Sequence, residues 1–132
     1  MAYGTNPVIA NQLLDALFSG AAFTSPAGCF VQLHTGDPGV AGTSNISSFT
    51  TRTAVTWNSA AGGTKSISAT VAITASWSGT NNEQVTGLSF WSASTLGTFL
   101  VSTPLISPVT CTTGSPVNIP TLTAPWQPGV AA

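Results

Sequence analysis

Charged side chains are scarce in this sequence. Two basic and three acidic residues make up 4% of the chain, where an ordinary globular domain has roughly 25%. Two basic residues cannot neutralise a run of phosphates, so the composition excludes nucleic acid as a partner. A nearly neutral surface favours self-association, which suits a component of an assembly better than a free enzyme. The five charged residues are Arg52, Lys65, Asp15, Asp37 and Glu83.

Long apolar runs and cysteines are also scarce. No stretch approaches the roughly 18 apolar residues of a membrane-spanning helix, so we expect no membrane partner. The N-terminus lacks the positively charged region of a secretory signal. Two cysteines, Cys29 and Cys111, lie far apart in the sequence, and both a disulfide and two buried free thiols stay open.

The hydrophobic pattern predicts one helix followed by strands. Asn6 and Pro7 form a helix-start signal, and Gly20 suits the position after a helix, so we expect a helix over 7–19. Its apolar face either packs on its own domain, which is the default expectation, or docks on a neighbouring subunit. Alternating apolar and polar residues between Gly- and Pro-rich turns predict strands at about 29–35, 51–57, 65–77, 85–93, 98–105 and 117–124, with a tail over 125–132.

The longest alternation, over 65–77, is typical of an antiparallel sheet with one buried face. A bend near the middle of this run is an alternative. Pro104 and Pro108 predict a sheet edge at the end of the 98–105 strand, and Pro120 interrupts the last strand. We therefore predict a mainly β fold, an antiparallel β-sandwich or barrel-like domain of six to eight strands with one N-terminal α-helix, as a single domain over 1–132.

The most distinctive local chemistry lies in the LHTGDPG stretch, where the only histidine, His34, precedes a Gly-Asp-Pro-Gly turn. We interpret Asp37 and Pro38 as structural turn residues, with Asp37 accepting hydrogen bonds from turn amides. His34 is expected to hydrogen-bond a neighbouring loop. Arg52, the only arginine, is expected to clamp the 36–50 loop through carbonyl oxygens or Asp37.

The sequence does not indicate a catalytic, cofactor or metal site. A Ser-His-Asp arrangement could use His34 and Asp37, but there is no Gly-x-Ser-x-Gly elbow and the two lie three residues apart across a turn. His34, Asp37 and Glu83 lack a metal-ligand spacing. We therefore predict that the protein is not an enzyme. Trp126, between two prolines, is either an assembly contact on a docking arm or packs back on its own domain.

Four stretches also carry a resemblance to a known family. They are the helix ANQLLDALFSG (10–20), the LHTGDPG turn (33–39), the RTAVTW strand (52–57), and the segment from GLSFWSAS to GTFL (87–100). With these, the sequence resembles small phage virion proteins with an LHT-x-DPG motif, labelled tail-fibre or minor tail proteins, in phages of actinobacteria and relatives. The resemblance covers nearly the whole chain and implies a structural virion component without catalytic residues.

The resemblance also implies partners and a location. We expect a virion protein, assembled in the host bacterial cytoplasm, whose partners are other tail or capsid subunits. A tail fibre or minor tail protein is the favoured interpretation. The alternatives are a capsid decoration protein that cements the head, and a receptor- or glycan-binding module that uses its tryptophans. A β-sandwich on a symmetric particle commonly forms homo-oligomers, so we expect a trimer or ring.

Overall fold

The computed structural model describes residues 3–125, and these residues form one helix and eight strands. The helix α1 spans Pro7–Ser19, where the sequence predicts a helix over 7–19. The strands are β1 (Phe30–His34), β2 (Thr53–Ala54), β3 (Thr64–Ser66), β4 (Val71–Thr74), β5 (Glu83–Trp91), β6 (Phe99–Cys111), β7 (Val117–Ile119) and β8 (Thr123–Pro125).

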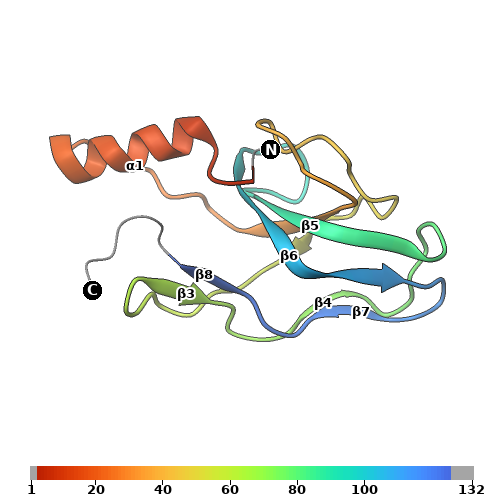
Figure 1. Cartoon of the computed structure of the whole chain (residues 1–132). Coiled ribbons are helices and arrows are strands. Elements are labelled where there is room, and N and C mark those ends of the chain that lie inside the picture. The colour runs from red at the N-terminus through yellow and green to blue at the C-terminus, as the bar shows by residue number, and fades with distance from the viewer. Residues whose placement is uncertain (1–2, 126–132) are drawn as a thin grey trace.

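The strands form antiparallel pairs in two layers (Figure 1). Within residues 3–125, one layer is a four-stranded sheet in the order β2-β1-β5-β6. The other layer is made of two strand pairs, β3 with β8 and β4 with β7. The predicted fold class, a mainly β antiparallel sandwich with one N-terminal helix, is confirmed.

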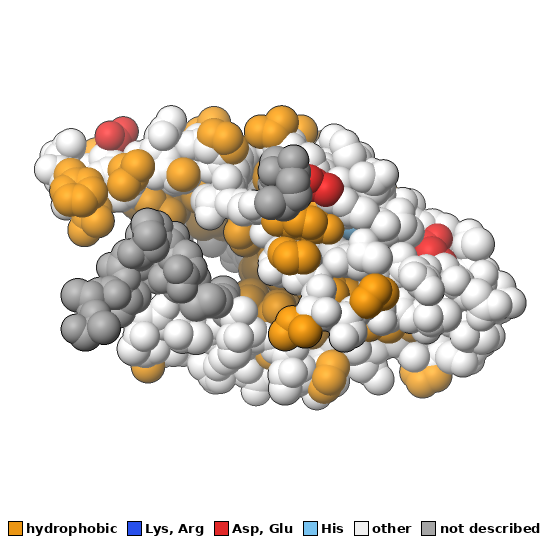
Figure 2. Space-filling model, in the orientation of Figure 1, with side chains coloured by type: hydrophobic (Ala, Val, Ile, Leu, Met, Phe, Trp, Pro, Cys, Tyr) orange, Lys and Arg blue, Asp and Glu red, His pale blue; other side chains and the backbone are white. Residues whose placement is uncertain are grey.

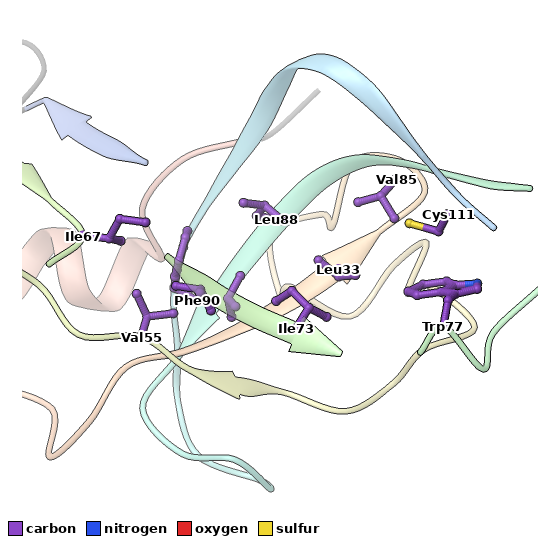
Figure 3. Close-up of a cluster of buried hydrophobic side chains, with 11 residues drawn as sticks. Leu33, Val55, Ile67, Ile73, Trp77, Val85, Leu88, Phe90 and Cys111 are labelled. Atoms are coloured by element: carbon purple, nitrogen blue, oxygen red, sulfur yellow. The ribbon is translucent and has the colours of Figure 1, made fainter. Parts of the chain in front are cut away.

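The hydrophobic core lies between these layers (Figure 3). Leu33 and Leu88 come from the four-stranded sheet, and Ile73 comes from the opposite layer. Complete burial of one such side chain contributes about 1.5–3 kcal/mol, so this cluster is the main source of stability. Its members are Val31, Leu33, Val55, Ile67, Val71, Ile73, Trp77, Val85, Leu88, Phe90 and Cys111.

The continuous strand predicted over 65–77 is wrong, and the alternative with a break in the middle is the one observed. β3 ends at Ser66 and pairs with β8, whereas β4 begins at Val71 and pairs with β7. The alternation is kept only in part, since Ile67, Val71, Ile73 and Trp77 are buried, whereas Ala69 and Ala75 at the same period are exposed. The period reports which side chains face the core, but it does not report which strand accepts the backbone hydrogen bonds. For the same reason, the strand predicted over 51–57 is observed only as the short β2, Thr53–Ala54.

β6 continues past its predicted end at residue 105 as far as Cys111. Between the pairs Val85–Val109 and Gly87–Pro104, β5 has one residue and β6 has four, so β6 bulges there. β6 is the edge of the four-stranded sheet, and an edge strand tolerates prolines because its outer N–H groups have no ladder partner to lose. The two prolines therefore shape the edge strand without ending it.

The first described residues cover part of this edge. The Asn6 amide donates to the Leu100 carbonyl and the Ser102 amide donates to the Gly4 carbonyl, both at 2.8 Å. Asn6 Nδ2 also donates to the Phe99 carbonyl at 2.7 Å. The chain is thus anchored on β6 immediately before α1 begins.

α1 then extends away from the sandwich (Figure 1). The default expectation, that its apolar face packs into the domain core, is wrong, because none of its side chains is buried. An amphipathic pattern predicts a helix with an apolar face, but it does not indicate which surface packs against that face. In the described part of the chain, no helix is both long and apolar enough to span a bilayer.

Candidate functional site

The β1–β2 loop, residues 35–52, contains most of the residues that the sequence analysis singled out. It folds back along β1, where the Ser47 amide donates to the Leu33 carbonyl at 3.0 Å. The loop lies on the face of β1 and β5 opposite the core, because Gln32 and His34 alternate with the core residue Leu33. The four-stranded sheet is therefore buried on both faces at this position.

His34 is completely buried at the end of β1. Its Nδ1 lies 2.7 Å from the Ser44 carbonyl oxygen, and because a carbonyl only accepts, Nδ1 carries the hydrogen. Nε2 is then left to accept the hydroxyl hydrogen of Ser89, at 2.7 Å. Ser89 Oγ in turn accepts from the indole N–H of Trp91, at 2.8 Å. The neutral imidazole is fully satisfied by this chain of hydrogen bonds.

The pKa of His34 reflects this environment. Burial lowers it from the ordinary value, because the charged ring loses its hydration. Hydrogen bonds to the carbonyls of Ser44 and Asn45 raise the pKa, which opposes part of that shift, and the positive charge of Arg52 lowers it further. The net effect keeps the imidazole neutral around pH 7.

Asp37 and Pro38 form the tight turn after β1. Asp37 Oδ1 accepts from the Gly39 amide at 2.8 Å, and the Asp37 carbonyl accepts from Asn45 Nδ2 at 2.8 Å. Pro38 is fully buried, and its carbonyl accepts from the Ser44 amide at 2.9 Å. An Asx turn and a buried proline fix the direction in which the loop leaves the sheet.

Gly42 brings the loop against the end of the β5–β6 hairpin. Its φ is +72°, in the left-handed region, and a Cβ placed there would lie 2.5 Å from the Phe99 ring. Glycine is required both by the backbone conformation and by the close approach of the ring.

Glu83 fastens the far end of the loop. Its carboxylate accepts from the Ser47 hydroxyl and from the Ser48 amide, the latter at 3.1 Å. Burial alone would raise the pKa of Glu83, but these hydrogen bonds to the charged form outweigh it and lower the pKa. In the sequence Glu83 stands out only as a candidate metal ligand, and no local pattern indicates this bond to the loop.

Arg52 lies over the Trp91 ring, with its guanidinium carbon 3.7 Å from the ring centroid. Its Nη1 donates to the carbonyls of Leu96, at 2.6 Å, and Ala93, at 3.2 Å. Its Nε donates to Gln32 Oε1 at 3.2 Å. These hydrogen bonds reach the loop between β5 and β6, a segment that the sequence analysis did not connect with Arg52.

The arrangement holds the β1–β2 loop in place, and it engages the candidate catalytic side chains in hydrogen bonds within the protein. Both nitrogens of His34 are engaged, and Ser89 is buried within the same chain of hydrogen bonds. Cys29 and Cys111 are free thiols whose pKa values are raised by burial, which suppresses the nucleophilic thiolate. Among residues 3–125, no group of three or more His, Cys, Asp or Glu residues is placed to hold a metal ion.

A separate groove of about 350 Å³ lies where the start of α1 faces the segment before β1. The lining has no titratable side chain, so a ligand would be recognised there by its shape and by hydrogen bonds to a few hydroxyl groups. The lining residues are Val8, Ile9, Gln12, Thr24, Ser25, Pro26, Ala27, Ser92, Thr98 and Leu100.

The hydrogen bonds that hold the β1–β2 loop could be predicted from the sequence only in part. His34, Asp37 and Pro38 stand out as unusual residues, and each forms hydrogen bonds with the loop or within its turn. Arg52 was expected to bind carbonyl oxygens of the 36–50 loop, but the carbonyls that it binds are those of Ala93 and Leu96 in the β5–β6 loop. Ser89 was missed, and Trp91 was considered only as a strand residue and as one of the tryptophans open to a receptor- or glycan-binding module. Their signal was their alternation with Leu88 and Phe90 in β5, which places them on the face opposite the core. Trp126 lies outside the described residues.

The sequence matches a family of phage fibre proteins over most of its length. The model of the family described as podophage GP4 fiber I protein gp80 matches residues 5–125. The match runs from the segment anchored on β6 to the end of β8, so the chain belongs to this family of phage structural proteins. No curated protein matches the sequence.

Proposed function

We propose that this protein is a non-enzymatic tail fibre or minor tail component of a phage. The observation that carries the proposal is the match of residues 5–125 to a phage fibre family, which supports a structural role in the virion. A surface with two basic and three acidic residues supports it, because contacts between neutral surfaces do not depend on salt.

The residues at the candidate site serve this role as structural elements. In our proposal Asp37 and Pro38 form the turn, His34 joins the loop to β5, and Arg52 clamps the neighbouring hairpin loop. Support comes from the engagement of both His34 ring nitrogens within the protein. A rigid loop on a rigid sheet gives a surface of fixed shape, as an assembly subunit needs.

The proposal includes one domain over 1–132 that assembles with other virion proteins, and with copies of itself, in the host bacterial cytoplasm. The alternative of a glycan-binding module would need exposed aromatic rings. Trp77 and Trp91 are buried, at 1% and 6% exposure, and Trp57 is partly buried against the core, which argues against these three rings as a binding platform.

The test is to locate the protein on intact particles with a specific antibody and electron microscopy. Label along the tail or at its tip is the expected result. Label over the head would make the protein a capsid decoration protein, and particles lacking it should then be tested for fragile heads. Mature particles without label would contradict a structural role in the virion.

A further inference from the structure

α1 forms a capped helix although the protein buries none of its side chains. Asn6 Oδ1 accepts from the Val8 amide at 2.9 Å, and Gly20 ends the helix in the left-handed conformation. An isolated helix of 13 residues is marginal in water, because nucleation is costly and few hydrogen bonds follow it. Helices of this length are normally stabilised by packing of an apolar face.

The apolar face of α1 is a stripe formed by the half-buried Ala10 and by the exposed Leu14, Leu17 and Phe18. These positions follow the i, i+4, i+7, i+8 spacing of one helix face. Leu14, Leu17 and Phe18 are 50%, 67% and 78% exposed. Figure 2 shows hydrophobic side chains along α1 and at its free end.

Charge restricts what that partner can be. Asp15 is the only charged residue of α1, and it lies off the stripe. A partner recognised by charge would find no complement on this face. A second copy of the same face would meet no like charge, which satisfies the self-complementarity that a twofold contact requires.

We propose that α1 is the docking element for a second copy of this chain, with two α1 helices packed antiparallel about a twofold axis at Leu14. A residue four positions before Leu14 then lies beside the residue four positions after it. The small Ala10 of one copy therefore faces the large Phe18 of the other. This contact does not depend on where in the virion the protein lies, and it differs from the trimer or ring expected from the sequence.

The ends of α1 fit the antiparallel direction. The first turn has no acidic residue and the last turn has no basic residue, so no charged side chain of these turns counters either end of the helix dipole. In an antiparallel pair, the positive end of one helix lies beside the negative end of the other. A parallel pair would bring like ends together.

Cysteine cross-linking tests the register. Leu14→Cys alone should form a disulfide between copies, because the residue lies on the twofold axis. Ala10→Cys and Phe18→Cys should each fail alone but cross-link when mixed. Wild type, with Cys29 and Cys111, gives the background. Self-cross-linking of Ala10→Cys would indicate parallel helices, as in a trimer, and would overturn the proposal.

Sedimentation or light scattering over a concentration series tests the dimer itself. Two short helices make a small interface, so we expect a mass twice the 13.3 kDa of the monomer only at high protein concentration. Leu14→Asp should weaken this dimer by about tenfold or more, the equivalent of about 1.4 kcal/mol. Ile106→Asp, at a fully exposed apolar residue of β6, is the matched control and should leave the dimer unchanged.

Two results would overturn the proposal. One is an equal effect of Leu14→Asp and Ile106→Asp on the dimer. The other is a protein that is monomeric at every concentration and whose α1 amides lose hydrogen-exchange protection when residues 126–132 are removed. That result would make the tail of the same chain the occupant of the stripe.

Discussion

The β1–β2 loop and α1 reverse the usual distribution of polar and apolar side chains. The loop region buries polar residues such as His34 and Ser89, each at 0% exposure. α1 instead exposes large apolar residues such as Leu17 and Phe18. Buried polar groups are stable only when each one is hydrogen-bonded, and in residues 3–125 no buried side-chain nitrogen or oxygen lacks a partner.

The two regions differ in whether their interactions are completed within one chain or leave a surface open to another chain. The buried polar groups of the loop region find their hydrogen-bond partners within one chain, so substitutions there should change the unfolding free energy of the monomer. The stripe on α1 contacts nothing that buries it, so its substitution should change association and leave the monomer nearly unaffected.

His34→Leu should cost about 2–4 kcal/mol of unfolding free energy. The leucine removes an acceptor for the buried Ser89 hydroxyl, which costs about 1–3 kcal/mol when left unpaired, and the lost bond to the Ser44 carbonyl, which is partly buried, adds about 1 kcal/mol. Urea unfolding at a concentration where the protein is monomeric measures the change. Leu14→Ser on α1 is the control and should stay within about 0.5 kcal/mol. Similar losses in the two variants would abolish the contrast between the regions.

Gly42→Ala should cost about 2–3 kcal/mol, because the methyl group meets the Phe99 ring in addition to straining a left-handed backbone. Gly62→Ala is the matched control. Gly62 has a φ of +57° but no atom within 4 Å of its Cβ position, so only the backbone cost of about 1 kcal/mol remains. Thermal unfolding of both variants isolates the contact. Equal shifts would mean that the loop moves away from Phe99 at little cost.

Stability should fall as the pH drops below about 6.5, the ordinary pKa of histidine. The pKa of His34 is lower in the folded state, so the unfolded chain takes up its proton first and acid favours unfolding. Glu83 adds to this effect below about 4.5, because its folded pKa is also lowered and its stabilisation is lost on protonation.

Unfolding free energies between pH 5 and 7 check this dependence, and His34→Gln is the control. Glutamine does not titrate, so the slope over this range should flatten in the variant. An unchanged slope would mean that His34 is not the group responsible.

Asn6→Ala should have the smallest effect, about 1 kcal/mol, by removing the helix cap and the bond to the Phe99 carbonyl. Far-ultraviolet circular dichroism should show loss of helix, while the near-ultraviolet signal of buried Trp77 and Trp91 should persist. Loss of the near-ultraviolet signal would show that α1 and the sandwich unfold together.

The sequence alone determined the elements whose signals are local. The cap at Asn6, the proline after it and the glycine at position 20 specify α1, because these effects act within one helical turn. Alternation specified which residues face the core, including Ile67, Val71 and Ile73. The Gly-Asp-Pro-Gly turn was readable for the same reason, since its hydrogen bonds span only a few residues.

Only the tertiary structure decided which segments meet. The 65–77 run divides between β8 and β7, β6 continues through two prolines because it is an edge, and Arg52 binds a loop more than 40 residues away, at Ala93 and Leu96. Each of these depends on a partner distant in sequence, and side-chain periodicity carries no information about that partner. α1 is a further example. Its apolar stripe predicts that another surface covers the helix, but only the tertiary structure shows whether that surface belongs to the same chain.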